Sequence, residues 1–332
     1  MQNLYKIIFL FIIGFSAQAQ ELLSLEDAVK IALENNYDIK IAENNSKIDA
    51  TNNNLANAGM LPSLNANFTN NNSQLNTTQT QADGSERKLD NAKNMNLTYG
   101  VGLDWTIFDG LSMFARKEQL NALEQQGKAE LQAAILTRIS DVYTTYFDLV
   151  QQQQVLASID TAIVISNQRL TTAQNRFSIG KASKLEVLNA QVDLNSDLSL
   201  QLRQKELIKI SKIRLNELLV RDIQTDFKVA KEVTFEQNFD FNELKSTAEK
   251  QNPQLQAQIL SKKVADLNLK QVKGNRYPTV RVTSGYNFTR SEASLGFITQ
   301  SSGQGFVYGV TATVPIFNGF LQNRNEKVAK YQ

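Results

Sequence analysis

The sequence predicts a mainly α-helical chain with a long helical hairpin and four β-strands that enter a membrane. Three observations indicate this fold class. Matching segments recur at constant offsets, so the chain contains a duplication. Four segments alternate between apolar and polar residues, which is typical of strands with one apolar face. No proline lies between Pro62 and Pro253, which leaves room for very long helices.

The composition excludes several kinds of chemistry. The 332 residues include no cysteine and no histidine. Disulfides, thiolate metal sites and lipid attachment through cysteine are therefore absent, as are Ser-His-Asp catalysis and histidine-ligated zinc. The net charge is +2, from 35 basic and 33 acidic residues, so no global field favours nucleic acid. We predict no enzyme activity, no cofactor, no metal and no nucleic-acid partner.

Residues 1–19 have the pattern of a secretory signal peptide. Lys6 precedes the apolar run Ile7–Ile13, and the small residues Ser16–Ala19 follow. A basic start, a short apolar centre and an Ala-x-Ala site predict cleavage after Ala19. The run is too short for a membrane-spanning helix, which needs about 20 apolar residues. No later stretch is apolar enough either, so we expect any entry into a bilayer to use strands.

Pairs of segments match in order along the chain, first at an offset of 216 residues and then at an offset of 209. The matches at 216 are Ser24–Asp27 with Asp240–Glu243, Asn36 with Asn252, and Met60–Leu64 with Arg276–Val280. The matches at 209 are Tyr99–Val101 with Tyr308–Val310, and Ile107–Gly110 with Ile316–Gly319. Each copy opens with an N-cap residue three positions before an acidic residue, which is the spacing of a capping box.

These matches divide the mature chain into a first repeat over 20–226, a linker over 227–239 and an incomplete second repeat over 240–332. In the first repeat we expect a helix over 25–58, strands over 62–72 and 97–108, and a helical hairpin over 111–219 that turns near residue 180. In the second we expect a helix over 241–274, strands over 279–289 and 306–316, and the start of a helix over 319–332. We expect the polar segments 70–96 and 290–305 to be loops.

The predicted strands have one apolar and one polar face. The residues expected to face lipid are Leu97, Val101, Leu103, Trp105, Val310 and Val314. The residues expected to face a lumen are Thr98, Asp104, Thr106, Thr311 and Thr313. A soluble sheet on a core is the alternative. The strand lengths, the small hydrophilic residues of the polar face and the aromatic residues near the strand ends favour the membrane.

Four strands cannot close a barrel, and a membrane-spanning sheet cannot keep a free edge. Closure therefore requires several copies of the chain. Two copies would give eight strands, a barrel that its own side chains would fill. Three copies would give twelve strands, which leaves a pore. We therefore expect an oligomer and favour a homotrimer.

A helical hairpin follows Gly110. An apolar stripe recurs at three- and four-residue steps, on Leu131, Ile135, Ile139, Val142, Tyr146 and Leu149. A helix from Leu111 to about Arg176 would be roughly 100 Å long, whereas a bilayer core is about 30 Å thick. Gly180 suits a tight turn, and Leu185, Leu188 and Val192 share one face of the returning helix.

The stretch Arg176–Gln191, which reads RFSIGKASKLEVLNAQ, resembles the helix-turn-helix tip of the TolC-like outer-membrane efflux proteins. An aromatic residue lies three positions before a glycine, and Glu-Val-Leu and Ala-Gln follow. The Pro-x-Leu/Val strand starts and the Ile-Phe-Asp/Asn-Gly strand ends also match that family. The resemblance covers the whole mature chain.

The resemblance implies a trimeric twelve-stranded barrel in the outer membrane, in contact with its lipid, and a long α-helical tunnel in the periplasm. It implies passive export of drugs, metals or proteins in a tripartite efflux or type I secretion system. The expected partners are a periplasmic adaptor (membrane fusion) protein and an inner-membrane pump. Adaptor contact would fall at the tip, on Phe177, Ile179, Gly180, Lys181, Ala182 and Ser183.

The chain departs from the family after Gly319. The first copy continues about 116 residues past Gly110, whereas the second has thirteen residues after Gly319. A second hairpin is missing, so we expect this chain to be a fragment and assign no gate residue.

Two other functions are possible from the sequence. A periplasmic adaptor or coiled-coil scaffold protein would also have a signal peptide and long hairpins. A secreted enzyme would need carboxylates such as Glu26, Asp27 or Asp104, which are better explained as a capping pair and a strand residue.

Overall fold

The computed structural model describes residues 21–230, 240–295 and 298–332. The predicted signal peptide over 1–19 and most of the predicted linker lie outside the described residues. The chain forms two compact units. One combines the chain up to Asn44 with Leu131–Asn252, and the other combines Asn45–Glu130 with Pro253–Gln332.

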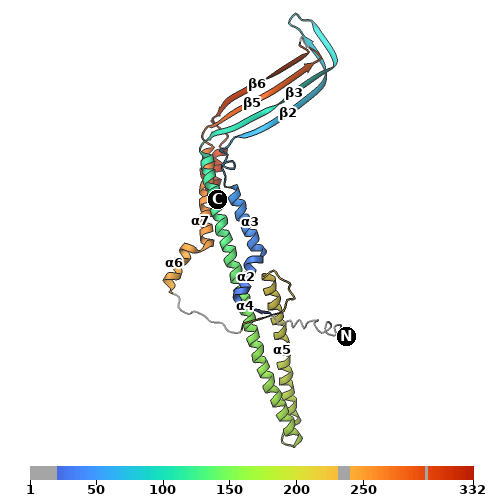
Figure 1. Ribbon diagram of the computed structural model, residues 1–332, viewed down its shortest axis with the longest axis vertical. Helices are drawn as coiled ribbons and strands as arrows, with labels where there is room; N and C mark the ends of the chain where they lie inside the picture. Colours follow the sequence, from blue (N-terminus) through green and yellow to red (C-terminus); the bar gives the residue numbers. More distant parts are fainter. Residues whose placement is uncertain (1–20, 231–239, 296–297) are drawn as a thin grey trace, which may run out of the picture. The chain divides into compact units, whose positions relative to one another are not determined.

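The first unit is built on a helical hairpin. Helix α4 (Ser112–Ser178) is continuous over 67 residues, and its part from Leu131 onward belongs to this unit. Helix α5 (Lys184–Leu218) returns beside it (Figure 1). A shorter helix, α6 (Phe241–Gln251), also belongs to this unit and buries none of its residues.

Polar side chains join α4 to α5. Hydrogen bonds of 2.7, 2.6 and 2.6 Å connect Asp148 with Ser211, Gln152 with Gln204, and Asp160 with Gln201. Ser166 donates a further bond to Asp197 nearer the turn. The apolar residues Leu185, Leu188 and Val192 of α5 are exposed instead. Hydrogen bonds therefore hold this part of the hairpin together, and several apolar residues remain on its outside.

The core of the first unit lies where α2 (Leu25–Asn35) meets the hairpin. Ser24 caps α2 by accepting the Asp27 N–H at 3.0 Å, and Ala28 and Ala32 are buried on the face toward the hairpin. Their small side chains allow close helix packing. The buried core residues are Leu23, Ala28, Ala32, Val142, Tyr146, Leu149, Val150, Leu215, Leu219, Phe227 and Val229.

A short pair of parallel strands completes this core. Strand β1 (Glu21–Leu23) pairs with β4 (Phe227–Val229). The Tyr146 hydroxyl donates to Leu23 O at 3.1 Å and accepts the Ala230 N–H at 3.2 Å. The expectation that a linker begins at residue 227 is therefore wrong. Three residues are too few to show a strand period, so the sequence pattern did not reveal β4.

A strained residue, Val220, follows the C-terminal cap of α5, and its φ of 53° lies in the left-handed region. Its N–H donates to Glu217 O, and that of Arg221 donates to Asn216 O, as in a Schellman motif. Val220→Gly is expected to raise the free energy of unfolding by about 1 kcal/mol, because glycine adopts this conformation without steric cost. Urea denaturation followed by circular dichroism measures the change, and a lower midpoint for the variant would contradict it.

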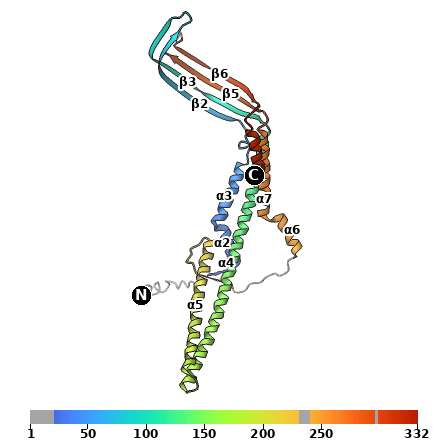
Figure 2. The ribbon, with the colours of Figure 1, turned by 180° about the vertical axis from the view of Figure 1, so that it is seen from behind.

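The second unit contains a four-stranded antiparallel sheet of order β2-β3-β5-β6 (Figure 2). Its strands are β2 (Ser63–Thr80), β3 (Glu86–Asp109), β5 (Thr279–Ala293) and β6 (Gln300–Thr313). Its helices are α7 (Pro253–Gly274), α8 (Leu321–Tyr331), the first turns of α4 and the last part of α3 (Tyr37–Asn52).

The loop expected over 70–96 is mostly strand, and this expectation is wrong. Pairing of β2 with β3 continues from Asn70↔Leu97 to Thr80↔Glu86. A tight turn closes the hairpin, where Gly84 has a φ of 85° and Asp83 accepts the Ser85 N–H at 2.9 Å. The dipeptide Asp83-Gly84 is a hairpin signal. The amide-rich composition obscured it.

The second predicted loop is also shorter than expected, and the last predicted strand begins and ends earlier than expected. Strand β5 continues to Ala293 and β6 begins at Gln300, so most of the expected loop over 290–305 is strand. Strand β6 ends at Thr313 rather than at residue 316. Pro315 follows, and proline has no N–H for a strand ladder.

Asparagines break each of the helices expected over 25–58 and 241–274 into two. Asn36 ends α2 with an extended backbone, and its Oδ1 accepts the Asp38 N–H at 2.9 Å. Asn252 ends α6 in the same conformation, and Pro253 begins α7. Helix α3 then stops at Asn52, where a run of asparagine side chains bonds to the local backbone.

The duplication is visible in the backbone. Gly110 and Leu111, which precede α4, have φ values of 69° and 67°. Gly319 and Phe320, which precede α8, have φ values of 66° and 63°. The two offsets found in the sequence thus mark the same structural positions, because both copies leave the sheet through the same left-handed turn.

Candidate functional site: the sheet and the helical tip

The register of the sheet collects its apolar residues on one face. Residues opposite each other in an antiparallel pair share a face. Trp105 lies opposite Val282, and Val282 lies opposite Val310. The same face carries Leu97, Val101 and Leu103, whereas Val314 lies just past the end of β6. Five of the six residues expected to face lipid therefore share one face.

The apolar face is about as long as a membrane-spanning strand. From Val280 to Phe288, alternate residues of β5 lie on it, and this span covers nine residues. A tilted strand needs about 9–11 residues to cross a bilayer. Aromatic rings gather on this face toward the end of the sheet that is farther from the helices. There Tyr99 stacks on Phe288 at 4.9 Å, and Tyr286 contacts Phe306 at 5.0 Å, between ring centroids.

The opposite face carries small polar residues. All five residues expected to face a lumen lie on it: Thr98, Asp104, Thr106, Thr311 and Thr313. Asn65, Asn67 and Thr69 of β2 share this face. The sheet therefore has two chemically distinct sides.

Every glycine of the four strands lies on the polar face, namely Gly100, Gly102, Gly285, Gly303, Gly305 and Gly309. A Cβ on Gly100 would collide with the Tyr286 carbonyl, and a Cβ on Gly285 would lie 2.9 Å from Val101 O. Close backbone approach of this kind is typical of glycines at tight bends of barrels. The polar face thus has the properties of the inner side of a curved sheet.

Neither face of the sheet is covered within the described chain. Phe306 and Tyr308 on the apolar face are 75% and 84% exposed. The outer edges of β2 and β6 have no strand partner among the described residues. Free edges and a large apolar patch are unstable in water. The sheet therefore requires partners at both edges and on its apolar face.

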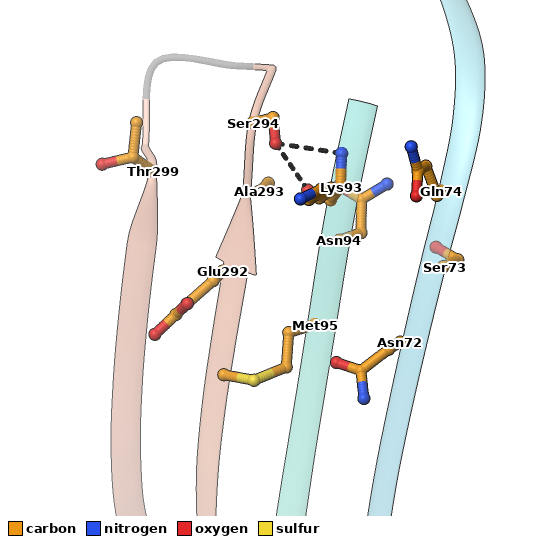
Figure 3. A pocket seen from close by; sticks show the side chains of 10 residues that line it. All are labelled: Asn72, Ser73, Gln74, Lys93, Asn94, Met95, Glu292, Ala293, Ser294 and Thr299. Carbon is orange, nitrogen blue, oxygen red and sulfur yellow. Dashed lines mark hydrogen bonds between the residues drawn. The ribbon is translucent and has the colours of Figure 1, made fainter. Parts of the chain in front are cut away.

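A shallow polar hollow of about 660 Å³ lies at the outer end of the sheet (Figure 3). Ser294 Oγ donates to Lys93 O at 2.8 Å and accepts the Lys93 N–H at 2.9 Å. These bonds extend the β3–β5 pairing by one residue beyond Ala293. The hollow therefore marks the place where the β2–β3 hairpin continues past the other two strands.

The helical tip is an exposed turn with a defined geometry. Gly180 has a φ of 75°, its N–H donates to Phe177 O, and the Lys181 N–H donates to Arg176 O. These bonds form a Schellman motif. Ser183 caps α5 by accepting the Glu186 N–H at 3.2 Å, and Arg176 pairs with Glu186 at 2.8 Å.

The structure brings together the six residues expected to contact an adaptor, since all lie in this turn or the helix ends beside it. Phe177 and Ile179 are 47% and 65% exposed. Lys181 and Ser183 are exposed, and Ala182 is half-buried. Sequence reasoning missed Arg176 and Glu186, whose ion pair ties the two helix ends together.

Other kinds of site find no support in the described residues. No cluster of three or more acidic, histidine or cysteine side chains there could hold a metal ion. No helix in the described ranges is long and apolar enough to cross a membrane. Glu26 and Asp27 lie in the first turn of α2, where Asp27 bonds to the capping residue Ser24.

A two-faced sheet with free edges, continuous with a long helical hairpin, is the fold of outer-membrane channel subunits. The profile of the family "Outer membrane efflux protein" matches residues 28–220, and the chain belongs to this family. No curated protein matches the chain significantly.

Solved structures share this fold at low sequence identity. The CmeC outer membrane channel of Campylobacter jejuni superposes with a TM-score of 0.78 at 18% identity, over 92% of this chain and 64% of CmeC. VceC of Vibrio cholerae gives 0.74 at 15% identity, over 92% of this chain and 72% of VceC. The MtrE channel of Neisseria gonorrhoeae gives 0.67 at 19%, over 92% and 66%. The chain thus spans less than two thirds of CmeC.

Proposed function

We propose that the chain is the outer-membrane channel subunit of a tripartite efflux or type I secretion system. In this role it is a passive conduit for small molecules or proteins, with no catalytic residue and no cofactor. The observation that carries the proposal is the two-faced sheet, whose apolar side suits lipid and whose glycine-rich polar side suits a water-filled lumen. The helical hairpin would extend into the periplasm.

Three copies would close the sheet into a twelve-stranded barrel, with β6 of one copy beside β2 of the next. These two edge strands run in opposite directions, because the four strands alternate in direction through the sheet. An antiparallel barrel requires this arrangement. Twelve strands leave a pore, whereas eight would be filled by side chains.

The two repeats make matching helix contacts within the second unit. Within each repeat, a helix before the sheet packs on the helix after it. Asn53, just past α3, donates to Glu124 of α4 at 2.5 Å, and Arg276, just past α7, pairs with Glu326 of α8 at 2.5 Å. Hydrogen bonds from Lys128 and Asn53 hold the pKa of Glu124 below its ordinary value, and Arg276 does the same for the pKa of Glu326.

Hydrogen bonds between α4 and α7 also join the two repeats within the chain. The Gln119 side chain on α4 donates to Val264 O on α7 at 3.3 Å, and Ser112 Oγ donates to Gln271 O at 3.1 Å. By the repeat offsets, Val328 of α8 corresponds to Gln119, and Ile48 of α3 corresponds to Val264. Ile48 and Val328 are 55% and 46% exposed. The proposed trimer would place α8 of one copy against α3 of the next in the same way.

Disulfide trapping tests this assembly in a chain that has no cysteine of its own. The double variant Ile48→Cys with Val328→Cys is expected to form covalent trimers on oxidation in membranes, since each copy supplies both halves of the contact. The mismatched pair Ile48→Cys with Leu321→Cys is the control. Leu321 lies seven residues from Val328 on α8, or about 10 Å along the helix.

Non-reducing denaturing gels give the result. Equal cross-linking of the matched and mismatched pairs would contradict the helix contact. A chain that stays monomeric in the outer-membrane fraction, or that fractionates as a soluble periplasmic protein, would contradict the channel itself.

The same proposal places a periplasmic adaptor protein, driven by an inner-membrane pump, at the helical tip. The exposed apolar side chains of Phe177 and Ile179 support this placement. The left-handed Gly180 and the two helix caps give the turn a fixed shape for recognition.

A further inference from the structure

We infer that Asp104 and Arg281 set the ion preference of the proposed channel, as unpaired opposite charges on the polar wall near the helix end of the sheet. The inference rests on the proposed function, because it needs this face to line a lumen.

The polar face is almost free of charge. In the four-stranded part of the described sheet, the charged residues of the polar face are Asp104, Asp109 and Arg281, which lie in three successive rows. Arg281 lies opposite Thr106, and the rows on either side of it contain Asp104 and Asp109. The remaining positions of the face, apart from Ala293 and Val307, are glycine, asparagine, serine or threonine.

The three charges differ in their partners. Asp109 accepts the Met113 N–H at 2.9 Å and thereby holds the start of α4. Asp104 and Arg281 are both exposed, and neither makes an ion pair or a side-chain hydrogen bond with another described residue. They occupy diagonal positions on neighbouring strands, about 7–8 Å apart, a distance that a long side chain can span, yet the structure shows no ion pair between them. Both charges therefore remain available to solutes in the lumen.

Unpaired wall charges attract ions of the opposite sign. At roughly 10 mM salt the Debye length is about 30 Å, so charges on all three copies would act across the pore. Because the two charges are opposite and adjacent, they partly cancel in the unsubstituted protein. Removal of either charge alone should then leave the effect of the other charge on ion permeability uncompensated.

Reversal potentials of the full-length protein in planar bilayers, under a KCl gradient at low salt, test the inference. Arg281→Gln is expected to raise the ratio of cation to anion permeability about two- to threefold, and Asp104→Asn to lower it by a similar factor. The double variant should return near the original ratio, and Arg281→Lys, which keeps the charge, should not move it. Arg290→Gln is the matched control, since it removes the same charge from the same strand on the apolar face, where Arg290 pairs with Glu292.

The outcomes separate the two proposals. Conductance with unchanged selectivity in both single variants would overturn the inference and leave the channel standing. An equal shift from Arg290→Gln would also overturn it, because the effect would then not depend on the face. Absence of conductance in the unsubstituted protein would overturn the proposed channel, and the inference with it.

Discussion

Phe227→Ala is expected to lower the free energy of unfolding of the first unit by about 3–5 kcal/mol. The ring is 0% exposed in the core formed with Leu149 and Leu215. Arg221 lies over it at 4.5 Å from the ring centroid and Lys212 at 5.6 Å. The substitution therefore leaves a cavity and removes two cation–π contacts, each worth roughly 0.5–1 kcal/mol.

Urea denaturation followed by circular dichroism measures this loss. Ile223→Ala is the control, because Ile223 lies in the connection just before β4 and is 52% exposed. We expect it to change stability by less than about 0.5 kcal/mol. Equal effects of the two substitutions would show that β4 does not belong to the core.

Gly110→Ala is expected to destabilise the second unit by several kcal/mol, because two costs combine at this turn. The φ of 69° is unfavourable for a residue with a side chain, by about 1 kcal/mol. In addition, the new Cβ would overlap the carbonyl of Gly274 at the end of α7. The turn from β3 into α4 would have to move away from α7.

The second copy provides a matched control, Gly319→Ala. Gly319 has nearly the same backbone, with a φ of 66°, but no atom lies within 4 Å of its Cβ position. In the solubilised monomer this substitution should cost only about 1 kcal/mol of backbone strain. The fluorescence of the single tryptophan, Trp105, which donates to Met60 O at the base of the sheet, reports both variants. Equal losses would exclude the collision with Gly274.

The sequence predicts the fold class because two of its signals are strong. Period-two alternation fixes which side chains share a face, and the register confirms that Trp105, Val282 and Val310 do so. The repeat offsets locate the same left-handed turns at Gly110 and Gly319. Both signals extend over many residues, so local exceptions do not erase them.

The remaining details depend on single side chains or on distant partners. Strand β4 has three residues, and only its pairing with Glu21–Leu23 across some 200 positions defines it. Helix α2 ends at Asn36 because the asparagine side chain reaches Leu218 O at 3.1 Å and also caps the next helix. The placement of Asp104 and Arg281 in neighbouring rows of one face likewise follows from the register alone. A one-residue slip would have moved one of them to the other face.

The restriction of the sheet glycines to one face has a consequence for the width of a pore. The number of strands and their tilt fix the radius of a barrel measured at its backbone. Side chains on the inner face reduce the open width of the pore. A row that contains Gly100, Gly285 or Gly305 reduces this width less than a row without glycine, because glycine has no side chain. A barrel of this chain could therefore admit bulkier solutes than its strand count alone would suggest, without adding a strand.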